Sequence, residues 1–237
     1  MRSISEKPVV TLCPGPISYD EALAKQMELH QLRCVDKIPD TLLLLEHQPV
    51  MTVGLSGGWQ FLKVPREFLE GQGIVFRETD RGGKITFHNP GQVVGYPIVK
   101  LALHGLSIST FVCRLQEMLI RVLADFGVVA YSRDRIIGVW TRGRKIASLG
   151  LRLHHGVTRH GFALNVNNDL TGFQMIDPCG LVGCEITSLQ KEGVDLSTTE
   201  VESKITGYWQ ELFEGMIHEV SKETGSGGDS PQRVAQI

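Results

Sequence analysis

The feature that most constrains this chain is a series of short strand-like runs with few helices between them. The runs are rich in β-branched and apolar residues, and Gly, Pro or Asn separates most of them, a pattern that favours hairpins. They cover residues 41–46, 74–78, 84–88, 93–97, 136–141, 145–153 and 161–166. Regular alternation of strands with helices is missing, so a parallel α/β fold is not expected.

Three segments have the apolar spacing of amphipathic helices. The first covers 18–33 and opens with Ser18 and Glu21, a capping box. The second covers 109–126 and ends before Gly127, and the third begins near Ser197. We expect all three apolar stripes to face the core. The predicted fold class is therefore α/β of the α+β type, with mixed β-sheets and helices packed on them.

The chain has 237 residues, which is enough for one full core. We predict a single domain over 1–224, followed by a flexible Gly/Ser-rich tail over 225–237. A hydrophobic content of 42% and a charged content of 21% are typical of a globular protein.

The formal net charge of −2 gives no basic field for nucleic acid. No apolar run approaches the roughly 20 residues of a membrane span, and no signal peptide is visible. Five cysteines at irregular spacing do not suggest a disulfide framework. We therefore expect a cytoplasmic protein without nucleic-acid or membrane partners.

Paired glycines mark the first segment that can carry chemistry, RGGKITFH at 81–88, which NPGQ follows. Glycines let a ligand approach the backbone closely or supply a turn with positive φ. A binding pocket and a solvated hairpin turn are both compatible with this segment. It is neither a P-loop nor a dinucleotide fingerprint.

Lys145 and Cys179 are the two candidates for a reactive pair. Lys145 enters a strand beside Ile146 and Ala147, so it is either half-buried or an edge-strand lysine that discourages aggregation, and the residues alone favour the edge. Cys179 lies between Pro178 and Gly180, which predicts an exposed turn thiol, although free cysteines are more often inert and buried.

A histidine-rich segment follows Lys145, with His154, His155 and His160 before Gly161. No carboxylate lies at ligand spacing, and Cys179 and Cys184 lack a second ligand pair, so no metal site is predicted. A hairpin with one functional histidine at its rim is the favoured interpretation.

Taken in order, these segments resemble the octanoyltransferase family, the lipoyl(octanoyl) transferases of lipoate biosynthesis. The resemblance covers nearly the whole ordered chain. It rests on LLLLEHQPVMTVG, RGGKITFHNPGQVVGYPI, GVW, KIASLGLR, HGFALNVNNDL, and PCG with a later TSL. The family usually has HGPGQ, and Asn89 replaces that glycine here.

The resemblance implies the catalytic fold shared by biotin and lipoate protein ligases. It implies that octanoyl passes from octanoyl-acyl carrier protein to Cys179, and then to a lysine of a lipoyl domain or of glycine-cleavage H protein. Lys145 matches the family's lysine, and no ATP, metal or other cofactor is implied. Small acyltransferases of this kind lead us to expect a monomer. The acyl-binding segments match Arg81, Gly82, Gly83, Lys84, Thr86 and His88, then Ser148, Leu149 and Gly150, and then Gly161, Phe162 and Ala163.

Such chemistry needs a thiolate, and an unperturbed cysteine has a pKa of about 8.5. An ammonium within about 4–6 Å lowers that pKa, so we expect Lys145 to lie beside Cys179. Three groups are candidates for removing the proton of the acceptor lysine: the Cys–Lys pair, His160 and His88.

Three other functions fit parts of the sequence. An ATP-dependent lipoate or biotin ligase of the same fold would need no catalytic thiol. An amidotransferase would take octanoyl from H protein, and a non-catalytic protein would only bind the acyl carrier. Cys179 disfavours the ligase, the order of the motifs disfavours the amidotransferase, and the presence of both Lys145 and Cys179 disfavours the non-catalytic protein.

Overall fold

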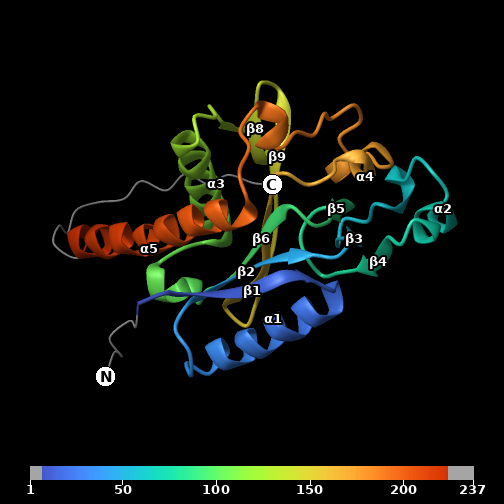
Figure 1. Ribbon diagram of the computed structural model, residues 1–237. Helices are drawn as coiled ribbons and strands as arrows, with labels where there is room; N and C mark the ends of the chain where they lie inside the picture. The colour runs from blue at the N-terminus through green and yellow to red at the C-terminus, as the bar shows by residue number, and fades with distance from the viewer. Residues whose placement is uncertain (1–6, 224–237) are drawn as a thin grey trace.

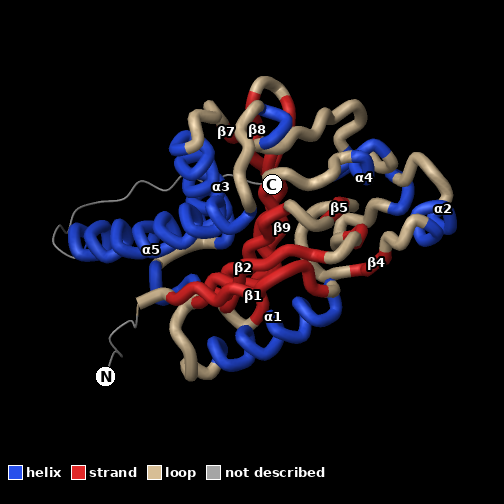
Figure 2. Tube along the Cα trace, viewed as in Figure 1, coloured by secondary structure: helices blue, strands red, loops and turns tan. Residues whose placement is uncertain are grey.

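A seven-stranded mixed sheet forms the centre of the computed structural model, which describes residues 7–223, without the side chains of Cys179 and of 213–223 (Figures 1 and 2). Its strand order is β1-β2-β6-β10-β9-β8-β7. The strands are β1 (Val9–Ile17), β2 (Thr41–His47), β6 (Gln92–Ile98), β7 (Tyr131–Arg133), β8 (Ile136–Thr141), β9 (Arg144–His154) and β10 (Val157–Asn165). Strands β1 and β2 are parallel, and the other neighbours are antiparallel. The predicted mixed sheet is confirmed.

Helices cover both faces of this sheet. Helix α1 (Tyr19–Cys34) lies on one face, and α3 (Ile108–Asp125) and α5 (Thr198–Glu223) pack together on the other (Figure 1). Side chains alternate along a strand, so β2 serves both layers. Leu42 and Leu44 join the core under α3 and α5, whereas Leu43 and Leu45 pack under α1. Burial on both faces explains the unbroken apolar run.

A smaller sheet of order β4-β3-β5 lies beside the main one, at the right of Figure 1. Its strands are β3 (Val50–Val53), β4 (Val75–Glu78) and β5 (Thr86–His88), and the short helices α2 (Arg66–Gly71) and α4 (Thr171–Gln174) flank it. It has its own apolar cluster, which includes Met51, Phe76 and Phe173. Short 3-10 turns complete the chain at Trp59–Phe61, Leu101–His104, Pro178–Gly180 and Gln190–Glu192.

The three predicted helices are confirmed, with small shifts at their ends. The Ser18 side chain caps α1 at Glu21 N (3.2 Å), and Ser197 and Glu200 form the second predicted capping box. The second helix begins at Ile108, one residue before the predicted start, because Ser107 caps it. The predicted tail, 225–237, lies outside the described residues.

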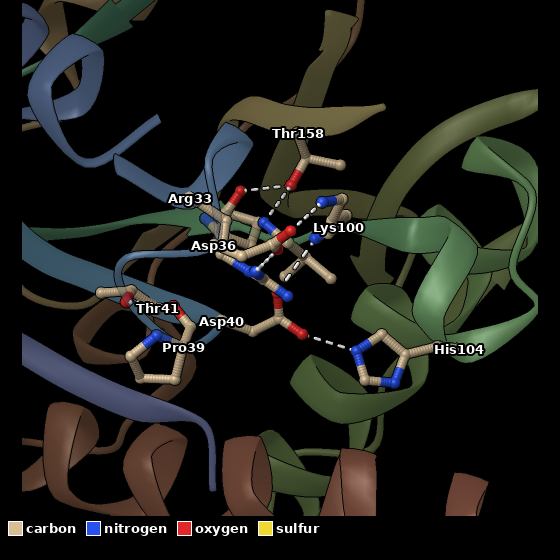
Figure 3. Close-up of polar contacts among 10 residues, drawn as sticks. Arg33, Asp36, Pro39, Asp40, Thr41, Lys100, His104 and Thr158 are labelled. Atoms are coloured by element: carbon tan, nitrogen blue, oxygen red, sulfur yellow. Dashed lines mark hydrogen bonds and ion pairs between the residues drawn. The ribbon is translucent and has the colours of Figure 1, made fainter. Parts of the chain in front are cut away.

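One prediction about α1 is wrong: its buried face is mostly polar, with Gln26, His30 and Arg33 below the surface. Arg33 donates to Asp40 Oδ1 at 2.7 Å, and His104 pairs with the other carboxylate oxygen (Figure 3). Burial alone would raise the pKa of Asp40, but the hydrogen bonds from His104 and Arg33 bring it below its usual value. This ionic cluster fixes the end of α1 against β2.

No helix among residues 7–223 is both long enough and apolar enough to cross a bilayer.

Candidate active site

An apolar cavity opens where the 81–88 segment lies against strands β6, β9 and β10. Its empty volume, which includes space open to solvent, is about 500 Å³. The predicted binding residues that line it are Arg81, Gly82, Gly83, Thr86, His88, Ser148, Leu149, Gly150, Gly161, Phe162 and Ala163, together with His160. Segments separated by some 80 positions in sequence therefore share one cavity, and we call it the acyl cavity.

Glycines allow the 81–83 loop to touch strand β9 directly. Gly82 N donates to Leu151 O at 3.1 Å. A Cβ atom on Gly150 would lie 2.6 Å from Gly82 O, closer than real Cβ contacts. Of the two interpretations of this segment, the structure selects the pocket wall, because the paired glycines close one side of the acyl cavity.

The Arg81 side chain fixes the position of the 81–84 loop through hydrogen bonds. Its guanidinium donates to Thr52 O (2.6 Å), to Thr52 Oγ1 (2.9 Å) and to Lys84 O (2.6 Å). These bonds tie the loop to strand β3 of the small sheet. Arg81 is therefore a structural anchor of the loop as well as a cation beside the cavity.

Two buried histidines lie at the acyl cavity, His88 in its wall and His47 next to His88. His88 Nδ1 donates to Gln92 Oε1 at 2.7 Å, and Tyr96 donates its hydroxyl to His47 Nε2 at 2.6 Å. Gln92 also donates to Asn165 Oδ1, which links β6 to β10. Burial lowers the pKa of His47 to about 4 and, with the neighbouring His47, that of His88 to about 3. Both rings are therefore neutral at pH 7.

Acid should destabilise the fold through these two rings. Their pKa values are lower in the folded than in the unfolded state, so their contribution is complete above pH 6.5 and is lost as the pH falls. We expect the free energy of unfolding to fall by about 1.4 kcal/mol per pH unit for each histidine between pH 6 and 4. Urea titrations across this range measure the slope.

Variants distinguish the contribution of the two buried histidines to this pH slope from that of other titrating groups. His47→Gln and His88→Gln should each flatten the slope. His155→Asn, at an exposed turn, should leave it unchanged, since Asn tolerates the positive φ of 49° found there. Equal slopes in all four proteins would contradict this assignment.

His160 is held by Asp80, a residue that the sequence did not single out. Nε2 of His160 donates to Asp80 Oδ1 at 2.7 Å, and Arg159 pairs with the other oxygen of the same carboxylate. Burial lowers the pKa of His160, although Asp80 opposes the shift. Asp80 directly precedes the 81–88 segment, which was the one available signal of its role.

The His160 ring is more constrained than a rim histidine would be. It lies within strand β10, 2% exposed, so the predicted place at the hairpin rim is wrong. The turn is formed by His155 and Gly156 instead. His160 has a positive φ of 57°, and its Nδ1 is buried without a hydrogen bond among the described residues. A neutral ring that donates from Nε2 carries its lone pair on Nδ1, where it can accept a proton.

Lys145 is fully buried, which excludes the edge-strand interpretation. It is 1% exposed and lies near the start of β9, between β10 and β8 rather than at a sheet edge. Its Nζ lies 5.7 Å from the centre of the Trp140 ring, and Gly138 leaves the space that the side chain occupies. Lysine side chains are seldom fully buried, so Lys145 is a candidate for a functional role.

The segment that carries Cys179 is held beside Lys145 by main-chain bonds. Lys145 N donates to Glu185 O at 2.8 Å, and Thr187 N donates to Lys145 O at 3.0 Å. On the other side of the cysteine, Asp177 N donates to Phe61 O at 2.9 Å. The backbone turn Pro178–Gly180 is thus fixed at both ends. The Cys179 side chain itself lies outside the described part of the chain.

Lys84 is the one predicted binding residue that does not line the acyl cavity. Its Nζ lies over the Phe61 ring at 4.7 Å and would be 2.7 Å from a Cβ atom on Gly180. It therefore supplies a second cation near the Cys179 turn. Among the described residues, no group of three or more His, Cys, Asp and Glu side chains could hold a metal ion.

Asn89, the departure from the family pattern, is a buried structural residue. It donates to Asp169 O at 2.9 Å and accepts from Asn168 Nδ2 at 3.0 Å. The turn takes its positive φ at Gly91 and not at Asn89. An amide at position 89 therefore fits the turn without strain and ties it to the 168–169 loop.

Comparison with known proteins places this chain in a class. The family model of the lipoyl protein ligase A/B catalytic domain matches residues 18–210. Among solved structures, a lipoate-protein ligase A bound with ATP superposes with a TM-score of 0.66 at 13% identity, covering 93% of this chain and 95% of that one. A biotin protein ligase from Aquifex aeolicus gives 0.54 at 12% identity, covering 93% and 74%. These likenesses confirm the predicted fold.

Sequence relatives narrow the class further. An octanoyltransferase of Caldicellulosiruptor saccharolyticus is 40% identical over 210 residues, covering 87% of this chain and 89% of that protein. One of Geobacter metallireducens is 45% identical over 175 residues, covering 74% and 79%. The chain belongs to the octanoyltransferase family, as its motifs predicted.

Proposed function

We propose that this protein transfers an octanoyl group from octanoyl-acyl carrier protein, through a thioester on Cys179, to a lysine ε-amine of a lipoyl domain. One observation carries the proposal. The buried Lys145 bonds through its main chain to the segment after Cys179, on the same strand as the cavity residues Ser148, Leu149 and Gly150. Lys145 therefore connects the segment after Cys179 with the strand that forms one wall of the acyl cavity.

In the first step the Cys179 thiolate attacks the carbonyl carbon of the donor thioester. A new carbon–sulfur bond forms, the bond to the carrier's sulfur breaks, and that sulfur leaves as a thiolate that takes up a proton. One thioester replaces another, so the step is nearly balanced and needs no ATP. The Lys145 ammonium stabilises the attacking thiolate by lowering its pKa.

In the second step the acceptor amine attacks the Cys179 thioester, an amide forms, and the cysteine is released as a thiolate. The amine must first lose its proton. His160 is the base that we propose, since Asp80 fixes its ring and leaves the Nδ1 lone pair unbonded among the described residues. Main-chain amides near Leu149, Gly150 and Cys179 are the candidates for holding the oxyanion.

The acceptors in this proposal are lipoyl domains of 2-oxoacid dehydrogenases and glycine-cleavage H protein. The family's activity implies both an acyl-carrier donor and such acceptors. The apolar acyl cavity is the place for the eight-carbon chain, with Phe162 and Ala163 in its wall.

An ATP-dependent ligase is the alternative to exclude, because the solved structures of this fold include ligases. The test is intact mass spectrometry of the full chain after incubation with octanoyl-carrier protein, without ATP and magnesium. We expect a gain of one octanoyl group, removed by hydroxylamine and mapped to Cys179 by peptide analysis.

Addition of a lipoyl domain should then return the enzyme to its original mass and acylate one lysine of the domain. No gain in mass without ATP would contradict the transferase proposal. An adduct mapped to Cys13, Cys34, Cys113 or Cys184 would show that another thiol carries the acyl group.

A further inference from the structure

A second, wider hollow adjoins the acyl cavity. Its empty volume is about 1,730 Å³, and it lies between the first half of α3, the β7–β8 turn and the 82–84 loop. Gly82, Gly83, Leu149 and Gly150 line both hollows. Leu181, two residues after Cys179, also lines the second one. We call it the α3 groove, and it meets the acyl cavity at the four shared residues.

We propose that the α3 groove binds the phosphopantetheine arm of the donor carrier protein, with Arg135 holding the phosphate at its mouth. This inference rests on the proposed function. When the octanoyl chain fills the acyl cavity, the rest of the donor thioester must leave the carbonyl in another direction. The α3 groove begins at the walls that it shares with the acyl cavity, so it can hold the part of the donor beyond the carbonyl.

The groove wall has the mixed character that a pantetheine arm requires. Ile108, Val112 and Ile136 present apolar surface for its dimethyl group and methylenes. Ser109 and Ser132 place hydroxyls along the same walls for its amides. The acyl cavity, by contrast, is a smaller pocket. The two hollows are therefore suited to different parts of one thioester.

The positive charge along the groove favours a phosphate. Lys84, Arg133 and Arg135 line the groove, and Asp134 is the acidic residue among its described lining. Arg133 stacks at 3.9 Å on the Trp140 ring, which fixes it in place. Arg135 is exposed and makes no side-chain ion pair or hydrogen bond among residues 7–223.

The tight β7–β8 turn holds Arg135 at this place. Its φ is 61°, in the left-handed region that non-glycine residues seldom adopt. An exposed guanidinium on a fixed two-residue turn presents a planar donor set to solvent, and such a set binds phosphate oxygens in pairs. The turn therefore places an anion-binding group at the outer end of the groove.

Two variants test the assignment on the full chain: Arg135→Glu reverses the charge, and Cys113→Trp fills the groove from α3. Acyl capture is measured with octanoyl-carrier protein, octanoyl-4′-phosphopantetheine and octanoyl-N-acetylcysteamine, which lacks most of the arm. Each variant should raise KM for the first two donors about tenfold and leave the third within about twofold. Arg135→Glu should also weaken the salt dependence of capture from the carrier.

Glu117→Trp is the matched control, because Glu117 is exposed on α3 but does not line the groove. It should leave all three donors unchanged. An effect on the carrier donor alone would overturn the assignment, because Arg135 would then touch the carrier's protein surface. Equal effects on all three donors, no effect, or a slower transfer to the lipoyl domain would overturn it too. If the unaltered enzyme captured octanoyl from none of the donors, the proposed function would fail instead.

Discussion

Lys145→Met is expected to slow acyl capture at pH 7 by about ten- to a hundredfold. The buried ammonium is the charge that we assign to stabilising the Cys179 thiolate. Without it the thiol should return toward a pKa of about 8.5, where only a few per cent is ionised at pH 7. Capture should therefore recover as the pH rises to about 9. Stopped-flow or quenched-flow mass measurements from pH 6 to 9.5 follow this shift.

Three further variants serve as controls for Lys145→Met. Cys179→Ala gives the background rate of capture without the nucleophile. Lys204→Met removes an exposed cation paired with Asp125, so it controls for net charge and should leave capture unchanged. Lys145→Arg keeps the charge, and turnover equal to the unaltered enzyme would show that a fixed cation suffices and that Lys145 gives up no proton. A Lys145→Met enzyme with an unaltered pH profile would remove Lys145 from the mechanism.

Lys145→Met should not unfold the protein. Burying an ammonium costs desolvation free energy, and an apolar side chain of similar volume avoids that cost. Thermal melting is expected at the same temperature as the unaltered enzyme or above it. A loss of capture with retained stability separates a chemical role from a structural one.

The main sheet could be predicted from local pattern because its central strands are apolar on both faces. The run from Leu42 to Leu45 has that character, and it lies between β1 and β6. Strand β1 escaped prediction because Pro14 and Pro16 interrupt its sequence. A sheet edge tolerates such prolines, since their missing N–H groups cost no ladder bond there.

The burial of charged and polar side chains could not be predicted from local sequence pattern. Lys145 follows a turn-like TRGR stretch, which suggests an edge, but its neighbour on one side is β10, whose partner β6 lies about 60 positions earlier. The buried polar face of α1 depends in the same way on distant partners, such as Asp40 for Arg33. Only the three-dimensional strand order reveals these positions.

The candidate site, like the fold, could be predicted only in part from the sequence. The family resemblance identified most walls of the acyl cavity, whereas the paired glycines alone left a turn and a pocket equally possible. Asp80 could not be assigned, because its partner His160 lies 80 positions later. The α3 groove combines α3, the β7–β8 turn and the 82–84 loop, and no single motif contains it.

Gly150→Val is expected to lower kcat/KM for octanoyl transfer by at least about a hundredfold. The position lies in the wall shared by the acyl cavity and the α3 groove. A Cβ atom there would lie 2.6 Å from Gly82 O, a backbone atom that cannot rotate away. The 82–84 loop must then move from β9, and Arg81, which is bonded to it, must move too. Steady-state rates with octanoyl-carrier protein measure the loss.

A graded series distinguishes this cause from general damage to the fold. Gly82→Ala places its Cβ 3.2 Å from Leu151 O, so it should lower kcat/KM less than Gly150→Ala, whose contact is 2.6 Å. Gly207→Ala is the control, because no atom lies within 4 Å of its Cβ position and it is exposed in α5. It should leave activity unchanged and stabilise the helix by about 0.5–1 kcal/mol. Because the order of the losses follows the order of the contacts, a Gly150→Val enzyme that kept full activity would show that the loop does not form the wall of the site.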